Sequence, residues 1–295
     1  MSILQRGEPP CARAPEPPLA TRPVHAGVSY LCAPAEVPIN YLYEPPPGTR
    51  RENCTYELRV IDIHDCRPAV GRLSVDRQGF ELREAPTRVA DFFDDAQVTR
   101  SYYPEIAELA RFVTGSTRAY VFDHLVRKRE PSRPLMSFGQ RSRGGQAGAA
   151  GRVHNDYTEA SGRRRLSRVV NDPHSEAAVT RFCILTLWRS ITPYPVLDTP
   201  LAVCDAGSVA AGDLVASEIR YRDRTGEIYL VTHSPDHRWW YVPKMERNEV
   251  LVFKQYDSAT GVAKFAPHAA FDHPDAPAGA RPRQSIEVRC LVTYD

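Results

Sequence analysis

The chain has 295 residues, of which 42% are hydrophobic and 25% are charged, and its formal net charge is +2. This balance is typical of a globular protein with one large domain or two small ones. The sequence holds no apolar run of the roughly 18 to 20 residues that cross a bilayer as a helix. Proteins that bind nucleic acid usually have a pI above about 9 and a clustered basic face. We therefore expect neither a membrane nor a nucleic acid as a partner.

Proline residues are concentrated at the start of the sequence, where 11 of the 26 lie within the first 50 positions. Residues 1–50 are therefore predicted to form a Pro-rich arm that wraps the domain or a partner, for example the second copy of a homodimer. Residues 51–295 are predicted to form a single domain. Residues 1–20 lack the apolar core of a secretory signal, and the seven cysteines show no CxxC spacing. Both features favour a cytoplasmic protein with free thiols.

From residue 55 onward, short apolar segments alternate with turn residues, which is typical of strands. Strands are predicted near 56–61, 73–75, 80–82, 119–126, 153–157, 182–190, 201–204, 213–221, 227–232, 238–242, 250–253 and 285–294, with a hairpin turn at 76–79. Residues 98–113 carry apolar side chains at helical spacing and Gly115 follows them, so this segment is predicted to be a helix. Residues 130–151 are predicted to form a loop. One clear helix and many short strands indicate a mainly β fold with flanking helices.

The triplet His154-Asn155-Asp156 is the sharpest motif in the sequence. Because side chains alternate along a strand, the imidazole of His154 and the carboxylate of Asp156 point to the same side. A second histidine from a distant strand would complete a triad of two histidines and one carboxylate. Such a triad binds Fe(II) and leaves positions open for a cosubstrate and O₂. The triplet alone is common by chance, so the prediction depends on the residues further along the chain.

The C-terminal segment supplies the missing partners. Residues 249–253 form an apolar strand, His268 follows it, and Arg283 comes 15 residues after His268. This order is found in double-stranded β-helix oxygenases, a jelly-roll or cupin-like fold. In these enzymes the arginine pairs with the distal carboxylate of 2-oxoglutarate through two hydrogen bonds. Four residues share the polar face of the last predicted strand: Arg283, Ser285, Glu287 and Arg289. This face is expected to line a polar cavity, while the apolar face packs against a second layer.

Six segments together resemble a known family, the hydroxylase/desaturase proteins of fungal and bacterial secondary-metabolite clusters. This family includes the cephamycin 7α-methoxylation component. The segments are 154–156, 200–205, 237–245, 253–258, 267–272 and 283–289. The resemblance covers roughly residues 50 to 295. It implies a double-stranded β-helix core and an oxygenase that depends on Fe(II) and 2-oxoglutarate, uses O₂, and acts on a small-molecule natural-product intermediate. Hydroxylation, desaturation and oxidative cyclisation all fit that chemistry.

On this interpretation the catalytic residues, which are also the metal ligands, are His154, Asp156 and His268. His268 is the preferred distal ligand because it lies between an apolar strand and the strand that carries the arginine, while His237 stays open as the alternative. The residues predicted to bind 2-oxoglutarate are Arg283 and Ser285, with Arg281 and Arg289 as further candidates.

Other polar and aromatic residues have competing structural and functional interpretations. Four residues are predicted to contact the substrate: His124, His237, Trp239 and Tyr241. Each of them also fits a structural role in a strand or core. The arginines at 163–165, together with Arg168, are interpreted as a solvated face of a loop or helix, with an anionic substrate as the alternative.

Two other functions are compatible with the sequence. One is a methyl-transfer or accessory component of a biosynthetic cluster, although no glycine-rich loop follows a predicted strand to receive the methyl donor. The other is a non-catalytic β-sandwich binding protein. Binding of Fe(II) together with 2-oxoglutarate separates the oxygenase from both.

Overall fold

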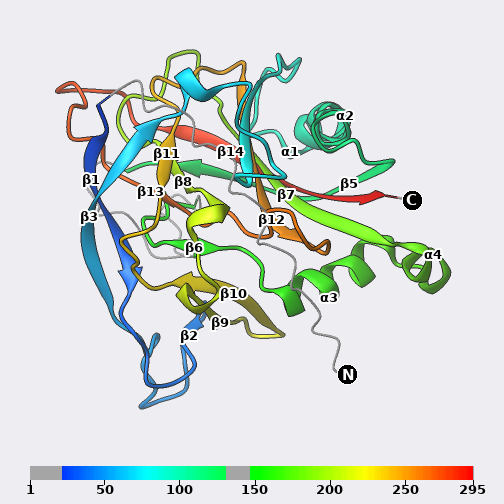
Figure 1. Ribbon diagram of the computed structural model, residues 1–295, viewed down its shortest axis with the longest axis horizontal. Helices are drawn as coiled ribbons and strands as arrows, with labels where there is room; N and C mark the ends of the chain where they lie inside the picture. The colour runs from blue at the N-terminus through cyan, green and yellow to red at the C-terminus, as the bar shows by residue number, and fades with distance from the viewer. Residues whose placement is uncertain (1–21, 131–146, 295) are drawn as a thin grey trace, which may run out of the picture.

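The computed structural model describes residues 22–130 and 147–294, and within these ranges two β-sheets make up most of the fold (Figure 1). The nine-stranded sheet has the order β1-β3-β11-β8-β13-β6-β10-β9-β2. Its strands are β1 (Val24–Leu31), β2 (Ile39–Tyr41), β3 (Tyr56–Asp65), β6 (His154–Asn155), β8 (Leu201–Cys204), β9 (Leu214–Arg220), β10 (Thr225–Val231), β11 (Trp239–Tyr241) and β13 (His268–Ala270). The five-stranded sheet, β4-β12-β7-β14-β5, contains β4 (Phe80–Glu84), β5 (Arg118–Lys128), β7 (Arg181–Ser190), β12 (Glu249–Asp257) and β14 (Gln284–Tyr294).

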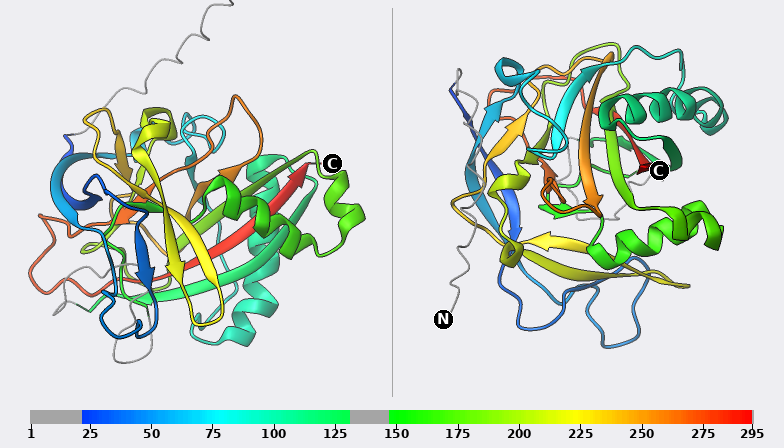
Figure 2. Two further views of the ribbon diagram at one scale, coloured as in Figure 1. Left: turned by 90° about the horizontal axis from the view of Figure 1, so that it is seen from below. Right: turned by 45° about the vertical axis from the view of Figure 1, so that its right-hand side comes forward.

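The two sheets face each other across a hydrophobic core, as Figure 2 shows from two further directions. Trp240 of β11 enters this core from the larger sheet, and Trp188 of β7 and Phe253 of β12 enter it from the smaller one. Within the smaller sheet, β14 pairs antiparallel with β5 on one side and β7 on the other. This pair of curled sheets confirms the predicted double-stranded β-helix, mainly β with flanking helices.

The predicted two-faced character of the last strand is confirmed. Four alternate residues of β14 lie in the core outside the smaller sheet: Ile286, Val288, Cys290 and Val292. The other set, which includes Ser285, Glu287 and Arg289, therefore faces the space between the sheets. This strand thus carries polar groups into the interior of the molecule.

The larger sheet curls until its first strand returns to the chain just before β6. Ser29 of β1 receives a hydrogen bond from the backbone N–H of Val153 at 2.8 Å and donates its own to Gly151 at 3.2 Å. The curl encloses a second small core, to which Tyr30 and Trp239 belong.

The prediction of an arm at residues 1–50 is wrong in part. β1 and β2 lie within this range, and they pair with β3 and β9. Ala26, Val28 and Tyr30 are buried while His25, Gly27 and Ser29 are more open, which is an ordinary strand alternation. The high mean proline content of residues 1–50 is the reason that this strand was not predicted from the sequence. Residues 1–21 lie outside the described ranges, so an arm or dimer contact there stays a prediction.

The predicted helix at 98–113 is confirmed. It begins as α1 (Asp95–Gln97) and a π-helical turn (Val98–Tyr102), and it continues as α2 (Tyr103–Thr114). Gly115 ends it with φ of 67°, a left-handed conformation that glycine adopts without a steric penalty. Ile106 and Ala110 bury their side chains in the core on the outer face of the smaller sheet, which α2 covers (Figures 1 and 2).

Two more helices follow β6 directly, α3 (Glu159–Val170) and α4 (Pro173–Ala178), and the sequence did not predict them as helices. Short 3-10 turns cover Arg67–Ala69, Ala206–Ser208 and Ala211–Asp213. The predicted hairpin at 76–79 is not formed, because β4 pairs with β12 instead.

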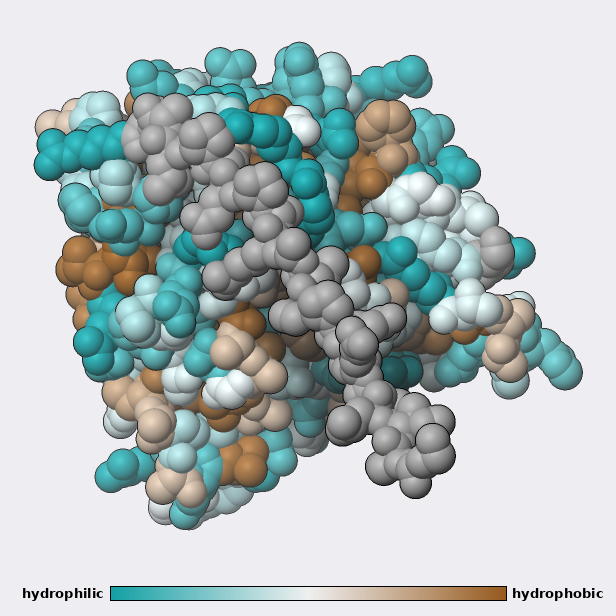
Figure 3. All heavy atoms as spheres, viewed as in Figure 1, coloured by the Kyte–Doolittle hydropathy of each residue, from teal (hydrophilic) through white to brown (hydrophobic). Residues whose placement is uncertain are grey.

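On the face in Figure 3, hydrophobic residues form small separate groups among hydrophilic ones. Exposed apolar side chains include Leu58 and Val60 of β3. Among the described helices, none has the length and apolar content that a membrane span needs.

Candidate metal centre

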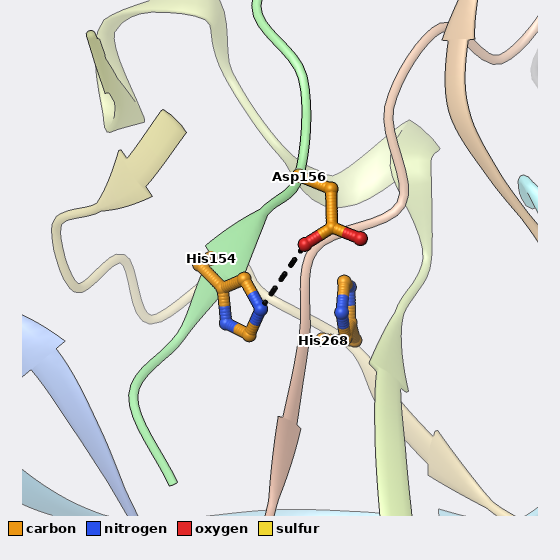
Figure 4. Close-up of side chains that lie close together, drawn as sticks. All are labelled: His154, Asp156 and His268. Atoms are coloured by element: carbon orange, nitrogen blue, oxygen red, sulfur yellow. Dashed lines mark ion pairs between the residues drawn. The ribbon is translucent and has the colours of Figure 1, made fainter. Parts of the chain in front are cut away.

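Three predicted ligands converge between the sheets. β6 and β13 are antiparallel neighbours in which His268 pairs directly with His154, and their ring centroids lie 4.4 Å apart. Asp156 follows one residue beyond the end of β6 and turns its carboxylate toward both rings (Figure 4). One ligand atom from each of the three residues lies within 4.8 Å of the others. Within the described ranges this is the only group of three such side chains with the spacing of a metal site.

Backbone carbonyls fix the tautomer of both imidazoles, that is, which ring nitrogen carries the proton. The Nδ1–H of His154 donates to the carbonyl oxygen of Arg152 at 2.7 Å, and that of His268 donates to Ala266 at 3.4 Å. A carbonyl only accepts, so Nδ1 carries the proton and Nε2 is left with a lone pair. Burial, together with the neighbouring His154, lowers the pKa of His268 to about 3. Both features leave His268 neutral and ready to act as a metal ligand.

The Asp156 carboxylate has one satisfied and one open oxygen. Its Oδ2 accepts from Nε of Arg289 at 2.9 Å. Its Oδ1 is buried, lies 3.5 Å from Nε2 of His154, and has no hydrogen-bond partner in the described part of the chain. Burial alone would raise the pKa of Asp156, but Arg289 and the two histidines hold it well below its usual range. Asp156 is therefore a buried anion with an unpartnered oxygen, which fits a cation between it and the two Nε2 atoms.

Arg289, predicted as a cofactor-binding residue, pairs with Asp156 in the structure. Its other two nitrogens bind Glu287 at 2.8 Å and Asp123 at 2.9 Å. Glu287 in turn receives two hydrogen bonds from Arg127, at 2.8 and 2.9 Å. The alternation of β14 placed Arg289 on the inner face but could not show which carboxylate it meets there.

The turn that carries Asp156 is tied to β12 by residues that the sequence did not single out. The side-chain amide of Asn155 donates to the carbonyl oxygens of Tyr157 at 2.7 Å and Gln255 at 2.8 Å. Gln255 accepts from the backbone N–H of Asp156 at 2.8 Å, and its own amide donates to Thr186 at 3.0 Å. Gln255 lies beside Lys254 in the polar end of β12, so no sequence pattern distinguished it. These bonds fix the position of the Asp156 carboxylate relative to His154 and His268.

Arg283 and Ser285 form a second polar group between the sheets. Both are buried, and Arg283 donates from Nη1 to the carbonyl oxygen of Thr199 at 2.8 Å. Within the described residues, Nε of Arg283 and the hydroxyl of Ser285 have no hydrogen-bond partner, and no carboxylate forms an ion pair with Arg283. Burial and the nearby Arg127 lower the pKa of Arg283 to about 9. A buried cation with open donors fits a carboxylate anion.

The two polar groups border the same core. The ring of Phe253 lies 4.8 Å from that of His268, and Phe253 packs in one cluster with Trp188. The guanidinium of Arg283 lies 5.5 Å from the Trp188 ring centroid. The packed side chains of Phe253 and Trp188 therefore link the two polar groups.

Two predicted site residues lie elsewhere. Arg281 is exposed and its guanidinium stacks 5.0 Å from the ring of Tyr194, so it is not part of the buried cofactor group. His124 faces the outer side of β5, where it contacts Tyr103 at 2.9 Å and Asp95 at 3.3 Å. The alternation of β5 turns His124 toward α2. The sequence predicted this helix but not the side of β5 on which it packs.

The other predicted substrate residues belong to the small core inside the curl. His237 contacts Tyr30 at 3.0 Å and Asp213 at 3.1 Å, and it is not a member of the metal group. Trp239 donates to the same Tyr30 hydroxyl at 2.8 Å, and Tyr241 lies 3.3 Å from His273. Trp239 and Tyr241 therefore lie in the small core, while their neighbour Trp240 points into the core between the sheets, which is the expected alternation of β11.

Known proteins support the same assignment. A family described as "Oxidoreductase/YMDC permease-like domain" matches residues 28–293. The Fe(II)/2-oxoglutarate-dependent dioxygenase nvfI of Aspergillus novofumigatus is 31% identical over 261 residues, which cover 85% of this chain and 89% of that protein. The hydroxylase/desaturase efuI of Hormonema carpetanum is 31% identical over 258 residues, covering 81% and 85%. The solved structure of the iron and alpha-ketoglutarate-dependent endoperoxidase NvfI matches with a TM-score of 0.83 at 26% identity, covering 92% of this chain and 98% of that one.

The fold and the His-Asp-His group define an Fe(II)- and 2-oxoglutarate-dependent oxygenase of the double-stranded β-helix class. Within this class, the chain belongs to the family of hydroxylase/desaturases and Fe(II)/2-oxoglutarate-dependent dioxygenases of secondary-metabolite clusters. The predicted enzyme class and its use of Fe(II), 2-oxoglutarate and O₂ are thereby confirmed.

Proposed function

We propose that the chain oxidises a small-molecule natural-product intermediate, with Fe(II) held by His154, Asp156 and His268. The observation that carries the proposal is the convergence of two imidazole lone pairs on a buried carboxylate whose Oδ1 has no hydrogen-bond partner in the described residues. Two nitrogens and one oxygen are the donor set of non-haem Fe(II) oxygenases. When bound, the iron and 2-oxoglutarate supply an O₂-dependent oxidation that converts 2-oxoglutarate to succinate and CO₂.

Arg283 and Ser285 hold the distal carboxylate of 2-oxoglutarate in this proposal. The planar guanidinium offers two parallel N–H donors, and the Ser285 hydroxyl offers a third. Because Arg283 has no carboxylate partner among the described residues, the cosubstrate supplies the negative charge that this buried cation lacks.

Arg289 and Gln255 position Asp156. Arg289 occupies Oδ2, so that Oδ1 is the oxygen presented to the metal. Gln255 fixes the backbone of Asp156 from the opposite sheet. Ligand orientation by such partners is usually needed for full metal affinity.

The outcome for the substrate depends on its placement. A substrate carbon whose C–H bond points toward the metal is hydroxylated. A second C–H bond on the neighbouring carbon leads to desaturation, and a nucleophile within the substrate leads to cyclisation. The six described cysteines are free thiols, which supports a reducing compartment such as the cytoplasm.

Succinate formation tests the proposal. Wild-type protein supplied with Fe(II), 2-oxoglutarate and O₂ is expected to form succinate, and Fe(II) omission or His154→Ala or Asp156→Ala is expected to abolish it. Arg163→Gln is the matched control, since this exposed side chain pairs with Glu159 on α3 and lies outside the centre. Circular dichroism checks that each variant is folded. Iron-loaded wild type that forms no succinate contradicts the proposal, and binding of S-adenosylmethionine instead would favour the methyl-transfer alternative.

A further inference from the structure

A cavity of about 200 Å³ lies between α3 and the β9–β10 hairpin and borders the metal centre on its Asp156 side, and neither His154 nor His268 lines it. Asp156 and Arg289 form its inner end. Its outer wall includes three arginines of α3, Arg164, Arg165 and Arg168. The volume is enough for a small ring system, since an apolar cavity of about 150 Å³ binds benzene.

The three arginines share one stripe of α3. Together with Ser161 they occupy positions i, i+3, i+4 and i+7, which lie on the same face of a helix. The opposite side of α3 packs into the core through Leu166.

Two features fix the position of α3 relative to the centre. Thr158 and Ser161 form a capping box, with hydrogen bonds of 2.9 and 3.0 Å, only two residues after Asp156. Gly162 lies so close to Tyr256 that a Cβ atom there would come within 2.7 Å of the ring. The arginine stripe is therefore held at the mouth of the cavity by the same turn that presents Asp156.

The acidic groups in the cavity wall already have partners. Asp123 and Asp156 each bind Arg289 at 2.9 Å. Glu227 accepts a hydrogen bond from the hydroxyl of Thr158 and lies 3.8 Å from Arg164. None of these contacts involves Arg165 or Arg168.

Arg165 and Arg168 have no carboxylate within ion-pair distance in the described part of the chain. Arg165 is partly buried, and its guanidinium stacks 4.8 Å from the ring of Phe122 and 5.7 Å from that of Tyr157. Stacking on aromatic faces holds a guanidinium in place without neutralising it. The cavity thus presents an oriented guanidinium that forms no ion pair with a carboxylate of the described residues.

We propose that this cavity binds the substrate and that Arg165, assisted by Arg168, pairs with a carboxylate of the substrate. The substrate class is therefore a small organic acid whose carboxylate points to α3 and whose reacting carbon points to Asp156. This inference rests on the proposed oxygenase function, because it takes the inner end of the cavity as the reaction centre. For Arg165 and Arg168, it favours the anionic-substrate alternative over a solvated helix face.

Matched aromatic probes test the inference on the enzyme loaded with Fe(II) and 2-oxoglutarate under anaerobic conditions. Calorimetric titration is expected to show that 1-naphthoate binds at least about tenfold more tightly than the neutral 1-naphthamide. Arg165→Gln is expected to reduce this preference to about twofold or less, Arg168→Gln to reduce it in part, and Arg165→Lys to retain much of it because the charge remains. Arg163→Gln, whose side chain pairs with Glu159 outside the cavity, is expected to leave it unchanged.

The visible Fe(II)–2-oxoglutarate band, recorded in the same samples, separates the possible failures. Equal affinity for the two probes, or binding of neither, overturns the anion site. An Arg165→Gln variant that weakens 2-oxoglutarate binding as much as naphthoate binding also overturns it, since the cavity would then serve the cosubstrate. Loss of naphthoate binding in Arg165→Gln, in a protein that shows no band, supports the anion site and refutes the oxygenase.

Discussion

His154 and His268 lie directly opposite each other on the antiparallel strands β6 and β13, with ring centroids 4.4 Å apart. Each donates its Nδ1–H to a backbone carbonyl two residues before it in the chain. Strand pairing thus sets the separation of the two rings, and the local backbone sets their tautomer. The geometry of the metal centre therefore depends on the register between β6 and β13. A change of this register would move the two histidines apart.

The choice of distal ligand gives the first prediction. His268→Ala is expected to abolish Fe(II) binding, because it removes one of three ligands. His237→Ala is expected to keep Fe(II) binding while lowering the free energy of unfolding by about 1–3 kcal/mol, because the buried Tyr30 hydroxyl loses a partner. Equilibrium dialysis with Fe(II) and urea unfolding measure the two effects. A His237→Ala protein that is folded but binds no iron would show that the ligand set is wrong.

The cosubstrate site gives the second prediction. Arg283→Lys is expected to raise the Kd for 2-oxoglutarate at least about tenfold, because an ammonium cannot form the two parallel bonds of a guanidinium. Ser285→Ala is expected to raise it about two- to tenfold, the usual value of one hydrogen bond. Arg281→Gln is the control, since that side chain is exposed and stacks on Tyr194. Equal effects of Arg281→Gln and Arg283→Lys would contradict this assignment.

Arg289 gives the third prediction, as a positioning residue. Arg289→Gln is expected to weaken Fe(II) binding about 10- to 100-fold, the usual effect of losing a group that orients a metal ligand. The readout is the Fe(II) affinity measured without 2-oxoglutarate, which a defect in cosubstrate binding would not change. If the variant binds Fe(II) normally but loses 2-oxoglutarate, Arg289 acts on the cosubstrate and the assignment fails.

A buried ion pair beyond the site gives the fourth prediction, on pH. The side chain of Asp257 is fully buried and binds Lys254 at 2.5 Å and Arg181 at 2.8 Å. Burial alone would raise the pKa of Asp257, but Arg181 and Lys254 outweigh it and hold the pKa below its ordinary value. A lowered pKa in the folded state contributes stability above the unfolded pKa of about 3.9, and this contribution is lost as the pH falls through the folded value.

Asp257→Asn is accordingly expected to lower the free energy of unfolding by about 3–5 kcal/mol at pH 7, because it leaves a buried charge poorly paired. The difference from wild type is expected to shrink below about pH 4. Urea unfolding at pH 7 and at pH 3.5 measures both values. The same difference at both pH values would show that the pair does not act through its charge.

The architecture and the shared side of His154 and Asp156 could be predicted from the sequence, because both arise from local patterns. The alternation of β14 placed Ser285 on the inner face, and the triplet at 154–156 aimed two ligands to one side. The strand that carries His268 has only three residues, so its pairing with β6 came from the fold and not from a local pattern.

Contacts that depend on packing could not be predicted. Arg289 was correctly placed on the inner face, but its partner Asp156 comes from a different part of the chain. The helix α3 was not predicted because its run of arginines lowers the mean hydropathy of the segment. That mean conceals the buried apolar side of the helix, which includes Leu166. Trp239 and Tyr241 were predicted as either substrate or core residues, and the curl of the larger sheet places them in a separate core.

Anaerobic titration with Fe(II) and 2-oxoglutarate is the most direct test of the central claim that His154, Asp156 and His268 form the iron site. The wild-type protein is expected to develop the weak visible charge-transfer band of an iron–2-oxoglutarate complex at one equivalent of each. His154→Ala, Asp156→Ala and His268→Ala, each shown to be folded, are expected to develop none. A wild-type protein without the band, or a folded His268→Ala variant that keeps it, would contradict the account.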